Sequence, residues 1–71
     1  MATISKQFGQ RVKQIRLEKK LSQGDVAKIL KVHRTYISGI ERGIRNPSLK
    51  VIDRVAKALQ VLIGDLVKDI S

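Results

Sequence analysis

Apolar residues recur every three or four positions along almost the whole chain, and this spacing constrains the fold more than any other feature of the sequence. Such spacing places apolar side chains on one face of a helix. The strict alternation that is typical of half-buried strands is absent from the sequence. The pattern therefore predicts an all-α protein whose amphipathic helices pack their apolar faces together.

The apolar stripes and the residues between them predict five short helices. The expected ranges are about 5–19, 22–30, 33–42, 48–59 and 63–69. Gly43 is suited to end the third helix because glycine adopts the left-handed conformation without steric cost. Ser48 can cap the fourth helix. The stripes expected to face the core are Ile4, Phe8, Val12 and Ile15; Val26, Ala27 and Leu30; Ile37 and Ile40; Leu49, Ile52, Val55, Ala56 and Leu59; and Leu66, Val67 and Ile70.

A length of 71 residues fits one domain over residues 1–71. The chain contains no cysteine. A chain of this size buries only about 60% of the surface that its unfolded form exposes. Without cysteine, neither a disulfide nor a thiolate zinc site can add stability. No secretory signal is visible, and no apolar run reaches the roughly 18 residues of a membrane span. We therefore expect a cytoplasmic protein that does not bind membranes.

The positive charge is concentrated in the first two thirds of the chain. Fifteen Lys and Arg and six Asp and Glu give a net charge of +9. Residues 1–50 hold twelve of the basic and three of the acidic side chains, whereas residues 51–71 hold three of each. A localised basic surface is typical of nucleic-acid-binding proteins. The alternative is a solvated basic surface that serves only solubility.

The second and third helices, over about residues 22–42, have the form of a helix-turn-helix unit. They are joined by a very tight turn at residues 31–32. Ser22 and Asp25 resemble a capping box at the start of the unit. The second helix of the unit is rich in small polar and basic residues. Because the DNA major groove is about 12 Å wide, it admits one such helix.

An enzyme is not expected from this sequence. No nucleophile, base and orienting residue form a plausible catalytic set, and neither a Gly-rich phosphate loop nor a metal-ligand spacing occurs. His33 is the single histidine. We therefore predict no catalytic residue, no metal, no cofactor and no small-molecule ligand.

Three segments carry a family resemblance. They are Leu21-Ser22-Gln23 with Val26-Ala27, Arg34-Thr35-Tyr36-Ile37-Ser38 with Ile40-Glu41-Arg42-Gly43, and Arg45-Asn46-Pro47-Ser48-Leu49. From Phe8 to about Val67 the chain resembles the lambda-repressor/Cro-type (XRE) helix-turn-helix transcriptional regulators. Residues 33–46 are also similar to the controller proteins of restriction–modification systems. The resemblance implies a compact five-helix fold and sequence-specific binding to double-stranded DNA, with residues 34–42 in the major groove of a two-fold symmetric operator.

The resemblance also implies roles for individual residues. The positions expected to read bases are Arg34, Thr35, Ser38 and Gly39. Those expected to contact the DNA backbone are Gln23, His33, Tyr36, Arg42, Arg45 and Asn46. Arg16 and Glu41 match a buried structural ion pair of the family. Alternatives remain for some of these residues: Tyr36 can simply cover the edge of the core, His33 can serve only as a helix-start residue, and Arg42 and Arg45 can be ordinary surface charges.

The sequence departs from the family pattern at three positions. Lys31 stands in the turn between the helices where glycine is usual and a positive φ is often needed. Gly24 replaces an acidic residue and should weaken the second helix by about 1 kcal/mol relative to alanine. Leu62 replaces the usual Ser or Thr cap before the last helix. These departures concern local stability rather than the face that would read DNA.

The end of the chain, about residues 61–71, is unusually apolar for a short segment. Residues 51–71 as a whole carry no net charge. Apolar residues left exposed usually mark an interface. The family resemblance implies a homodimer through this segment, with operator half-sites about 34 Å apart. In the alternative, all of these side chains cover the core of a monomer. The residues expected at the interface are Leu62, Ile63, Leu66, Val67 and Ile70.

Two other functions compete with operator binding. Some relatives of this fold act as antitoxins or coactivators, which bind another protein instead of DNA. Non-specific nucleic-acid binding is the second alternative, and it would show a steep salt dependence without sequence preference. Arg34, Thr35 and Ser38 favour operator binding, because a protein-interaction module needs no small polar and basic reading face.

Overall fold

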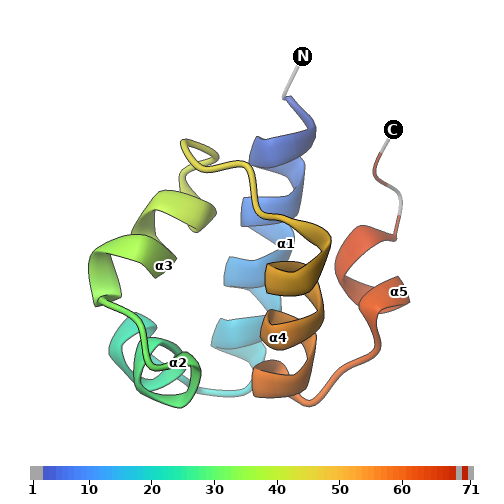
Figure 1. The fold of residues 1–71 in the computed structure, drawn as a ribbon. Coiled ribbons are helices and arrows are strands. Elements are labelled where there is room, and N and C mark those ends of the chain that lie inside the picture. Colours follow the sequence, from blue (N-terminus) through green and yellow to red (C-terminus); the bar gives the residue numbers. More distant parts are fainter. Residues whose placement is uncertain (1–2, 69, 71) are drawn as a thin grey trace.

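The computed structural model describes residues 3–68 and 70, and these residues form five helices and no strand. The helices are α1 (Ile4–Glu18), α2 (Gln23–Leu30), α3 (Arg34–Glu41), α4 (Leu49–Leu59) and α5 (Ile63–Val67) (Figure 1). The predicted all-α, five-helix architecture is confirmed, and each helix end lies within two residues of its expected position. Asp69, where the last helix was expected to end, lies outside the described residues.

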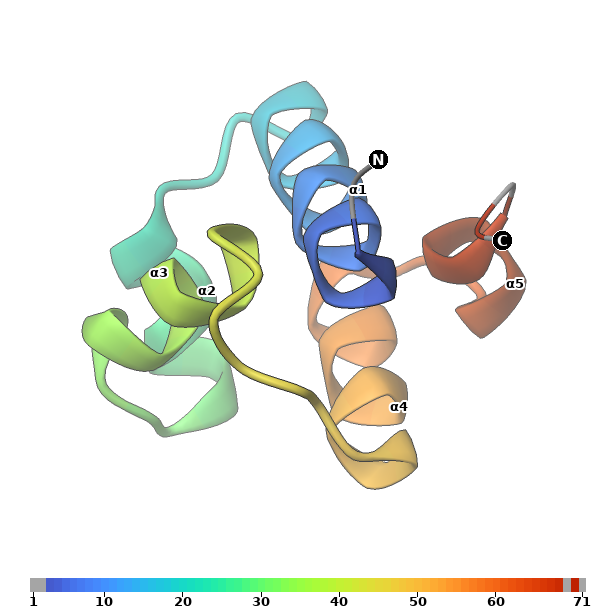
Figure 2. The ribbon, with the colours of Figure 1, turned by 90° about the horizontal axis from the view of Figure 1, so that it is seen from above.

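The helices are arranged around α1 and α4. Two perpendicular views place α2 and α3 on one side of α1 and α4, and place α5 on the other side (Figures 1 and 2). Helix α3 packs against α1 and α2, whereas α5 packs against α1 and α4. The recognition-helix candidate and the last helix therefore lie at opposite sides of the protein.

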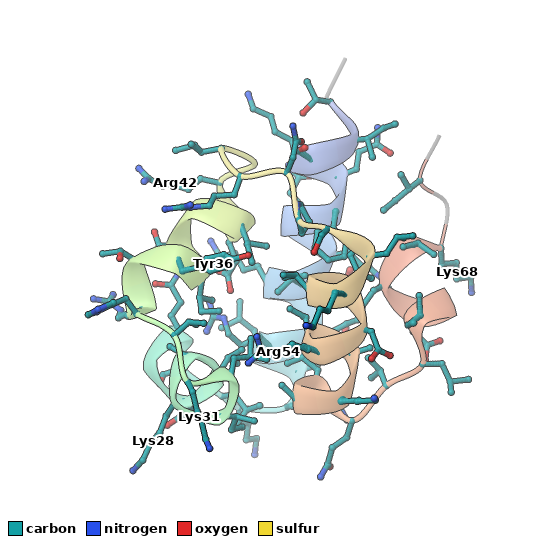
Figure 3. All side chains as sticks on the ribbon, in the orientation of Figure 1. Lys28, Lys31, Tyr36, Arg42, Arg54 and Lys68 are labelled. Atoms are coloured by element: carbon teal, nitrogen blue, oxygen red, sulfur yellow. The ribbon has the colours of Figure 1, made fainter. Side chains whose placement is uncertain are left out.

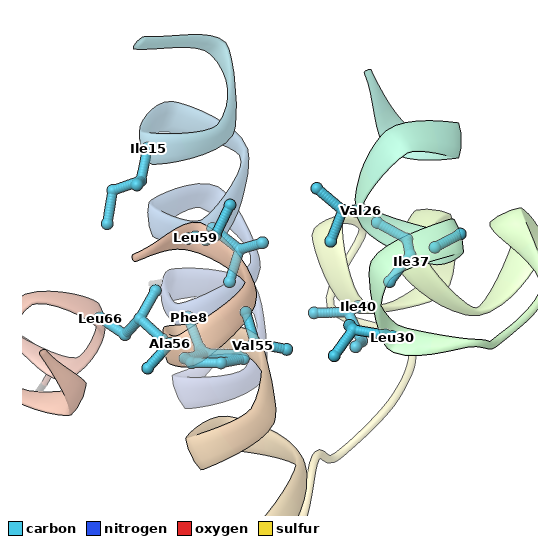
Figure 4. Close-up of a cluster of buried hydrophobic side chains, with 12 residues drawn as sticks. Phe8, Ile15, Val26, Leu30, Ile37, Ile40, Val55, Ala56, Leu59 and Leu66 are labelled. Carbon is cyan, nitrogen blue, oxygen red and sulfur yellow. The ribbon is translucent and has the colours of Figure 1, made fainter. Parts of the chain in front are cut away.

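A single cluster of apolar side chains from all five helices forms the core (Figure 4). The first residues of two predicted stripes are outside it: Ile4 is 61% exposed and Leu49 is 84% exposed. Each is the first residue of its helix. The buried apolar residues are Phe8, Val12, Ile15, Val26, Ala27, Leu30, Ile37, Ile40, Val55, Ala56, Leu59 and Leu66.

The structure corrects the predicted role of Leu66. Its side chain has no exposed surface, because α5 turns this residue towards α1 and α4. Leu66 belongs to the core of one protomer and cannot contact a second one. Ile70 is half-buried and packs against the same core. Of the residues predicted at a dimer interface, those that remain exposed are Leu62, Ile63 and Val67.

The start of α2 is held by a complete capping box. The Ser22 N–H donates to Asp25 Oδ2 at 2.8 Å, and the Asp25 N–H donates to Ser22 Oγ at 2.9 Å. The backbone hydrogen bond from Ser22, followed by the bond with its side chain, holds the pKa of Asp25 below its ordinary value. The stabilisation from this carboxylate is therefore fully present above the ordinary aspartate pKa of about 4 and is lost as the pH falls through the lowered pKa.

Two of the three positions that depart from the family pattern, Lys31 and Leu62, are accommodated by local backbone structure. Lys31 ends α2 in the left-handed conformation, with φ of 59° and ψ of 45°, so this turn needs the positive φ expected there. At the start of α5, the Leu62 N–H donates to Asp65 Oδ2 at 3.1 Å. Asp65 thus satisfies a backbone donor at the helix start although Leu62 lacks a capping hydroxyl.

Gly9 sets the distance between α1 and α3. A Cβ atom at Gly9 would lie 2.8 Å from the carbonyl oxygen of Glu41 and would approach the carbonyl oxygen of Ile40 even more closely. Both atoms belong to the backbone and cannot move without shifting α3. The α1–α3 crossing therefore requires glycine at this position.

Candidate DNA interface

Helix α3 presents a polar face on the outer side of the protein. Arg34 and Thr35, at its start, are exposed, and Ser38 is half-buried one turn later. The opposite face of α3 is buried: Ile37 and Ile40 are each 1% exposed in the core, and Glu41 is buried beside them. The sequence of α3 thus anchors one side of the helix and leaves small polar and basic side chains on the other.

The turns on both sides of α3 fix its position. The left-handed Lys31 ends α2, and exposed His33 begins α3 without a side-chain capping bond. At the other end, Arg42 is followed by Gly43, which has φ of 73°. A Cβ atom at Gly43 would also lie 2.7 Å from Lys6 Cα. Because both its conformation and its surroundings exclude a side chain, glycine is required at this position, where the chain leaves α3 beside the first turn of α1.

The loop after α3 brings further polar side chains to the end of that helix. Arg42 projects away from the helix bundle (Figure 3), and Arg45 and Asn46 are also exposed. The Ser5 hydroxyl donates to Asn46 Oδ1, which ties the loop to the first turn of α1. The structure therefore places Arg42, Arg45 and Asn46 at the C-terminal end of the predicted recognition helix.

Tyr36 and Gly39 differ in position from the other predicted contact residues. Tyr36 is half-buried and packs against the core, and the guanidinium carbon of Arg45 lies 5.1 Å from its ring centroid. Gly39 is buried, and the side chain of Arg45 covers it. The prediction that Gly39 lies on the open reading face is therefore wrong, because Arg45 occupies the space in front of it.

Gln23 opens α2, but its side chain is engaged inside the protein. Its Nε2 donates to Glu41 Oε1 at 3.1 Å, and the residue is half-buried. A phosphate contact at this position would therefore come from the backbone N–H groups at the start of α2, which carry the positive end of the helix dipole.

The predicted ion pair between Arg16 and Glu41 is present behind α3. Arg16 Nε donates to Glu41 Oε2 at 2.7 Å and its Nη2 donates to Glu41 Oε1 at 3.0 Å. The two side chains are only 8% and 3% exposed. Arg16 Nη1 also donates to the carbonyl oxygen of Leu21 at 2.8 Å. Together with Gln23, this pair ties α1, the start of α2 and the end of α3 into one hydrogen-bonded group.

Other classes of site find no support in the described part of the chain. No three of its His, Cys, Asp and Glu residues lie close enough to hold a metal ion. Among the helices of residues 3–68, none combines the length and the apolar content of a membrane span.

Sequence reasoning missed one residue and two contacts that shape this site. The residue is Gly9. The contacts are the hydrogen bond between Gln23 and Glu41 and the packing of the Arg45 side chain against Gly39 and Tyr36. The sequence could have indicated a packing role for Gly9, because this glycine lies three residues before Val12 and seven before Arg16, on the buried side of a helical pattern. The Gln23–Glu41 contact joins two helices, and the contacts of Arg45 join a loop residue to α3, so no helical or strand spacing indicates them.

Comparisons with known proteins identify the family. The helix-turn-helix family matches residues 12–66. The control protein C.BamHI of Bacillus amyloliquefaciens is 55% identical over 60 residues, which cover 83% of this chain and 74% of that protein. The crystal structure of the restriction–modification controller protein C.AhdI from Aeromonas hydrophila has 40% sequence identity and a TM-score of 0.84, over 87% of this chain and 94% of that chain.

A third comparison includes DNA. The tetramer of the restriction–modification controller protein C.Esp1396I, solved in complex with its natural 35 base-pair operator, has 34% sequence identity and a TM-score of 0.79. The similarity covers 96% of this chain and all of that one. These similarities agree with the helix-turn-helix geometry of α2 and α3. The chain therefore belongs to the XRE-type helix-turn-helix family, which also includes restriction–modification controller proteins.

Proposed function

We propose that this protein is a transcriptional regulator that binds a two-fold symmetric DNA operator as a homodimer and controls the expression of restriction–modification genes. It acts by binding and not by catalysis, in the cytoplasm of a bacterium, where its operator lies. The observation that carries the proposal is the exposed polar face of α3, with Arg34 and Thr35 at its start and an apolar, buried opposite side. The similarity to C.BamHI and C.AhdI supports the controller role.

The chemistry of this face suits base recognition. The guanidinium of Arg34 can donate two parallel hydrogen bonds to O6 and N7 of guanine. Thr35 offers a hydroxyl group and a methyl group, which suit a phosphate or the methyl of thymine. Arg42 and Asn46 lie beyond the end of α3, where the DNA backbone would pass. A reading helix flanked by cationic and amide side chains combines sequence readout with phosphate contacts.

The position of α5 supports a dimer with suitable half-site spacing. Helix α5 lies on the side of the protein opposite to α3, and the protein measures 30 × 22 × 22 Å. A two-fold axis beside α5 would therefore separate the two α3 helices by a distance comparable to one turn of DNA, about 34 Å. Leu62, Ile63 and Val67 are 76%, 44% and 39% exposed and would be covered in such a dimer.

Selection of binding sites from a random DNA pool tests the proposed function. Fluorescence anisotropy would then compare the selected DNA with scrambled DNA at several salt concentrations. We expect a two-fold repeat that binds roughly 10³-fold or more tightly than scrambled DNA, and that also occurs upstream of the gene for this protein. If no sequence emerges and binding only declines with salt, the protein is not an operator-binding regulator.

Replacement of Arg34 by alanine is expected to relax the preference at one base pair of each half-site. The loss of a bidentate contact to guanine should cost about 1–3 kcal/mol of discrimination at that position. Repeating the selection with the variant measures this effect. Lys57→Ala is the control, because it also removes one positive charge but alters only an exposed pair with Asp53 on α4. An unchanged preference in Arg34→Ala would exclude Arg34 as a base reader.

Replacement of Ile63 by lysine is expected to produce a monomer, because a charged side chain would be buried in the proposed interface. Sedimentation measures the change of state, and operator binding should weaken by about 100-fold or more as the second half-site contact is lost. Lysine adds positive charge, so the weakening cannot come from lost electrostatic attraction. Ile29→Lys on α2 is the control, because Ile29 is similarly exposed, at 54%. A dimeric Ile63→Lys variant would place the interface elsewhere.

A further inference from the structure

The side chain of Arg45 lies back across α3, although the residue belongs to the following loop. A Cβ atom at Gly39 would lie 3.1 Å from Arg45 Cγ and 3.5 Å from its Nε. The Arg45 guanidinium carbon is 5.1 Å from the centre of the Tyr36 ring, which is within the range of about 6 Å for a cation–π contact. Tyr36 and Gly39 are three residues apart on one helix face. Together they form a continuous seat for the arginine.

The backbone around Arg45 is also held in place. The Ile44 N–H donates to the Gly39 carbonyl oxygen at 3.0 Å, and the Arg45 N–H donates to the same oxygen at 3.4 Å. The next residue, Asn46, accepts a hydrogen bond from Ser5 on α1. Arg45 is thus fixed through its backbone to the end of α3, and its side chain rests on the same helix.

The seat leaves the guanidinium available to a ligand. None of the hydrogen bonds and ion pairs described for residues 3–68 and 70 engages the Arg45 guanidinium, in contrast to those of Arg11, Arg16 and Arg54. The residue is exposed, and with Tyr36, Ile44 and Asn46 it lines an open hollow at the surface. An arginine stacked by one face on an aromatic ring still presents its N–H edge to a base or a phosphate.

We propose that Gly39 is a positioning residue: the absence of a side chain at this position seats Arg45 against Tyr36, so that its guanidinium is ordered before DNA binds. Arginine has a large side-chain conformational entropy, so an arginine that is already ordered loses less entropy on contact with DNA. The inference rests on the DNA-binding function proposed above and adds a reason for glycine at a position that does not itself face the groove.

Nuclear magnetic resonance of the free, full-length protein tests the seat without DNA. The chain has one tyrosine, one phenylalanine and no tryptophan, and Tyr36 is the ring over which the Arg45 guanidinium lies, so a ring-current shift at Arg45 is assigned to Tyr36. We expect upfield-shifted side-chain protons of Arg45 in the wild-type protein and in Tyr36→Phe, which keeps the ring. The shift should decrease in Gly39→Ala, because the new methyl group would lie only 3.1 Å from Arg45 Cγ and would push this side chain away from its position on the ring. A retained shift in Gly39→Ala would overturn the proposal.

Operator binding then tests the consequence for recognition. Gly39→Ala should weaken binding to the selected DNA roughly threefold to tenfold, the effect expected when one long side chain loses its order before binding. The loss should fall on the same operator positions as that of Arg45→Ala. In the Arg45→Ala background, Gly39→Ala should cause no further loss. Independent, additive losses would overturn the proposal.

Thermal unfolding checks that these variants fold. The three nearest atoms to a Cβ at Gly39 all belong to the flexible side chain of Arg45, so the fold should be kept. In the Arg45→Ala background, alanine at position 39 should raise the Tm, because alanine favours a helix more than glycine does. A lowered Tm in that background would mean that the glycine is required by the fold, and this result would contradict the positioning role.

If the wild-type protein selects no DNA, the proposed function fails, while the resonance measurement still decides whether Gly39 seats Arg45.

Discussion

Replacement of Gly9 by alanine is expected to lower the free energy of unfolding by about 3 kcal/mol or more. The new Cβ atom would lie 2.8 Å from the Glu41 carbonyl oxygen and 2.9 Å from its carbonyl carbon. Overpacking a core side chain typically costs about 1–3 kcal/mol. Here the obstructing atoms belong to the backbone, so α1 and α3 must separate along their contact. In a domain of this size a loss of about 3 kcal/mol lowers the Tm by roughly 12–24 °C.

Thermal unfolding followed by far-ultraviolet circular dichroism measures this effect, and Gly24→Ala is the matched control. Gly24 also lies in a helix, but a Cβ atom there meets only Ser22 Oγ, at an ordinary contact distance of 3.6 Å. Alanine at position 24 should leave the stability unchanged or increase it by up to about 1 kcal/mol. If Gly9→Ala unfolded within a few degrees of the wild-type protein, the α1–α3 crossing could not be as rigid as the structure indicates.

Replacement of Glu41 by glutamine is expected to cost about 3–5 kcal/mol of stability. Glutamine keeps the size of the side chain and an oxygen acceptor but removes its charge. The Arg16 guanidinium, whose side chain is 8% exposed, would then be buried without a counterion. The single amide oxygen of glutamine can replace only one of the two carboxylate oxygens that accept from Arg16 and Gln23, so the group would also lose at least one hydrogen bond. Urea denaturation of the wild-type and variant proteins measures the difference.

Two variants separate the cost of a buried unpaired charge from that of a lost contact. Asp53→Asn breaks the exposed ion pair with Lys57, whose side chains are 43% and 77% exposed, and should cost no more than about 0.5 kcal/mol. The double variant Arg16→Met/Glu41→Leu removes both charges and should recover most of the stability lost in Glu41→Gln. A double variant as unstable as Glu41→Gln would show that the hydrogen bonds of the pair, rather than charge balance, hold these helices together.

The helices and the polar face of α3 could be predicted from the sequence because both depend on residues close together in the chain. The stripe of Ile37 and Ile40 determines which side of α3 is buried, and Arg34 and Thr35 then lie on the other side. The Ser22–Asp25 capping box is a local pattern within four residues. Gly43 likewise marks the end of α3, because its left-handed conformation is a local backbone requirement. The family resemblance added the ion pair between Arg16 and Glu41.

Exposure at the helix ends and in α5 could not be predicted in the same way. Ile4, Leu49 and Leu66 all follow the helical spacing, yet Leu66 is fully buried and the other two are largely exposed. The spacing determines the face of a helix on which a residue lies. It does not determine which part of that face the neighbouring helices cover.

The sequence by itself determined the all-α class, the five helices and the polar face of α3, because each follows from periodicity and capping within a few residues. Only the tertiary structure decided that Gly9 sets the α1–α3 distance, that Leu66 is a core residue and that Arg45 covers Gly39. These features join residues from separate elements. Their energies depend on distances between helices, which the packing of the whole chain sets and no local pattern encodes.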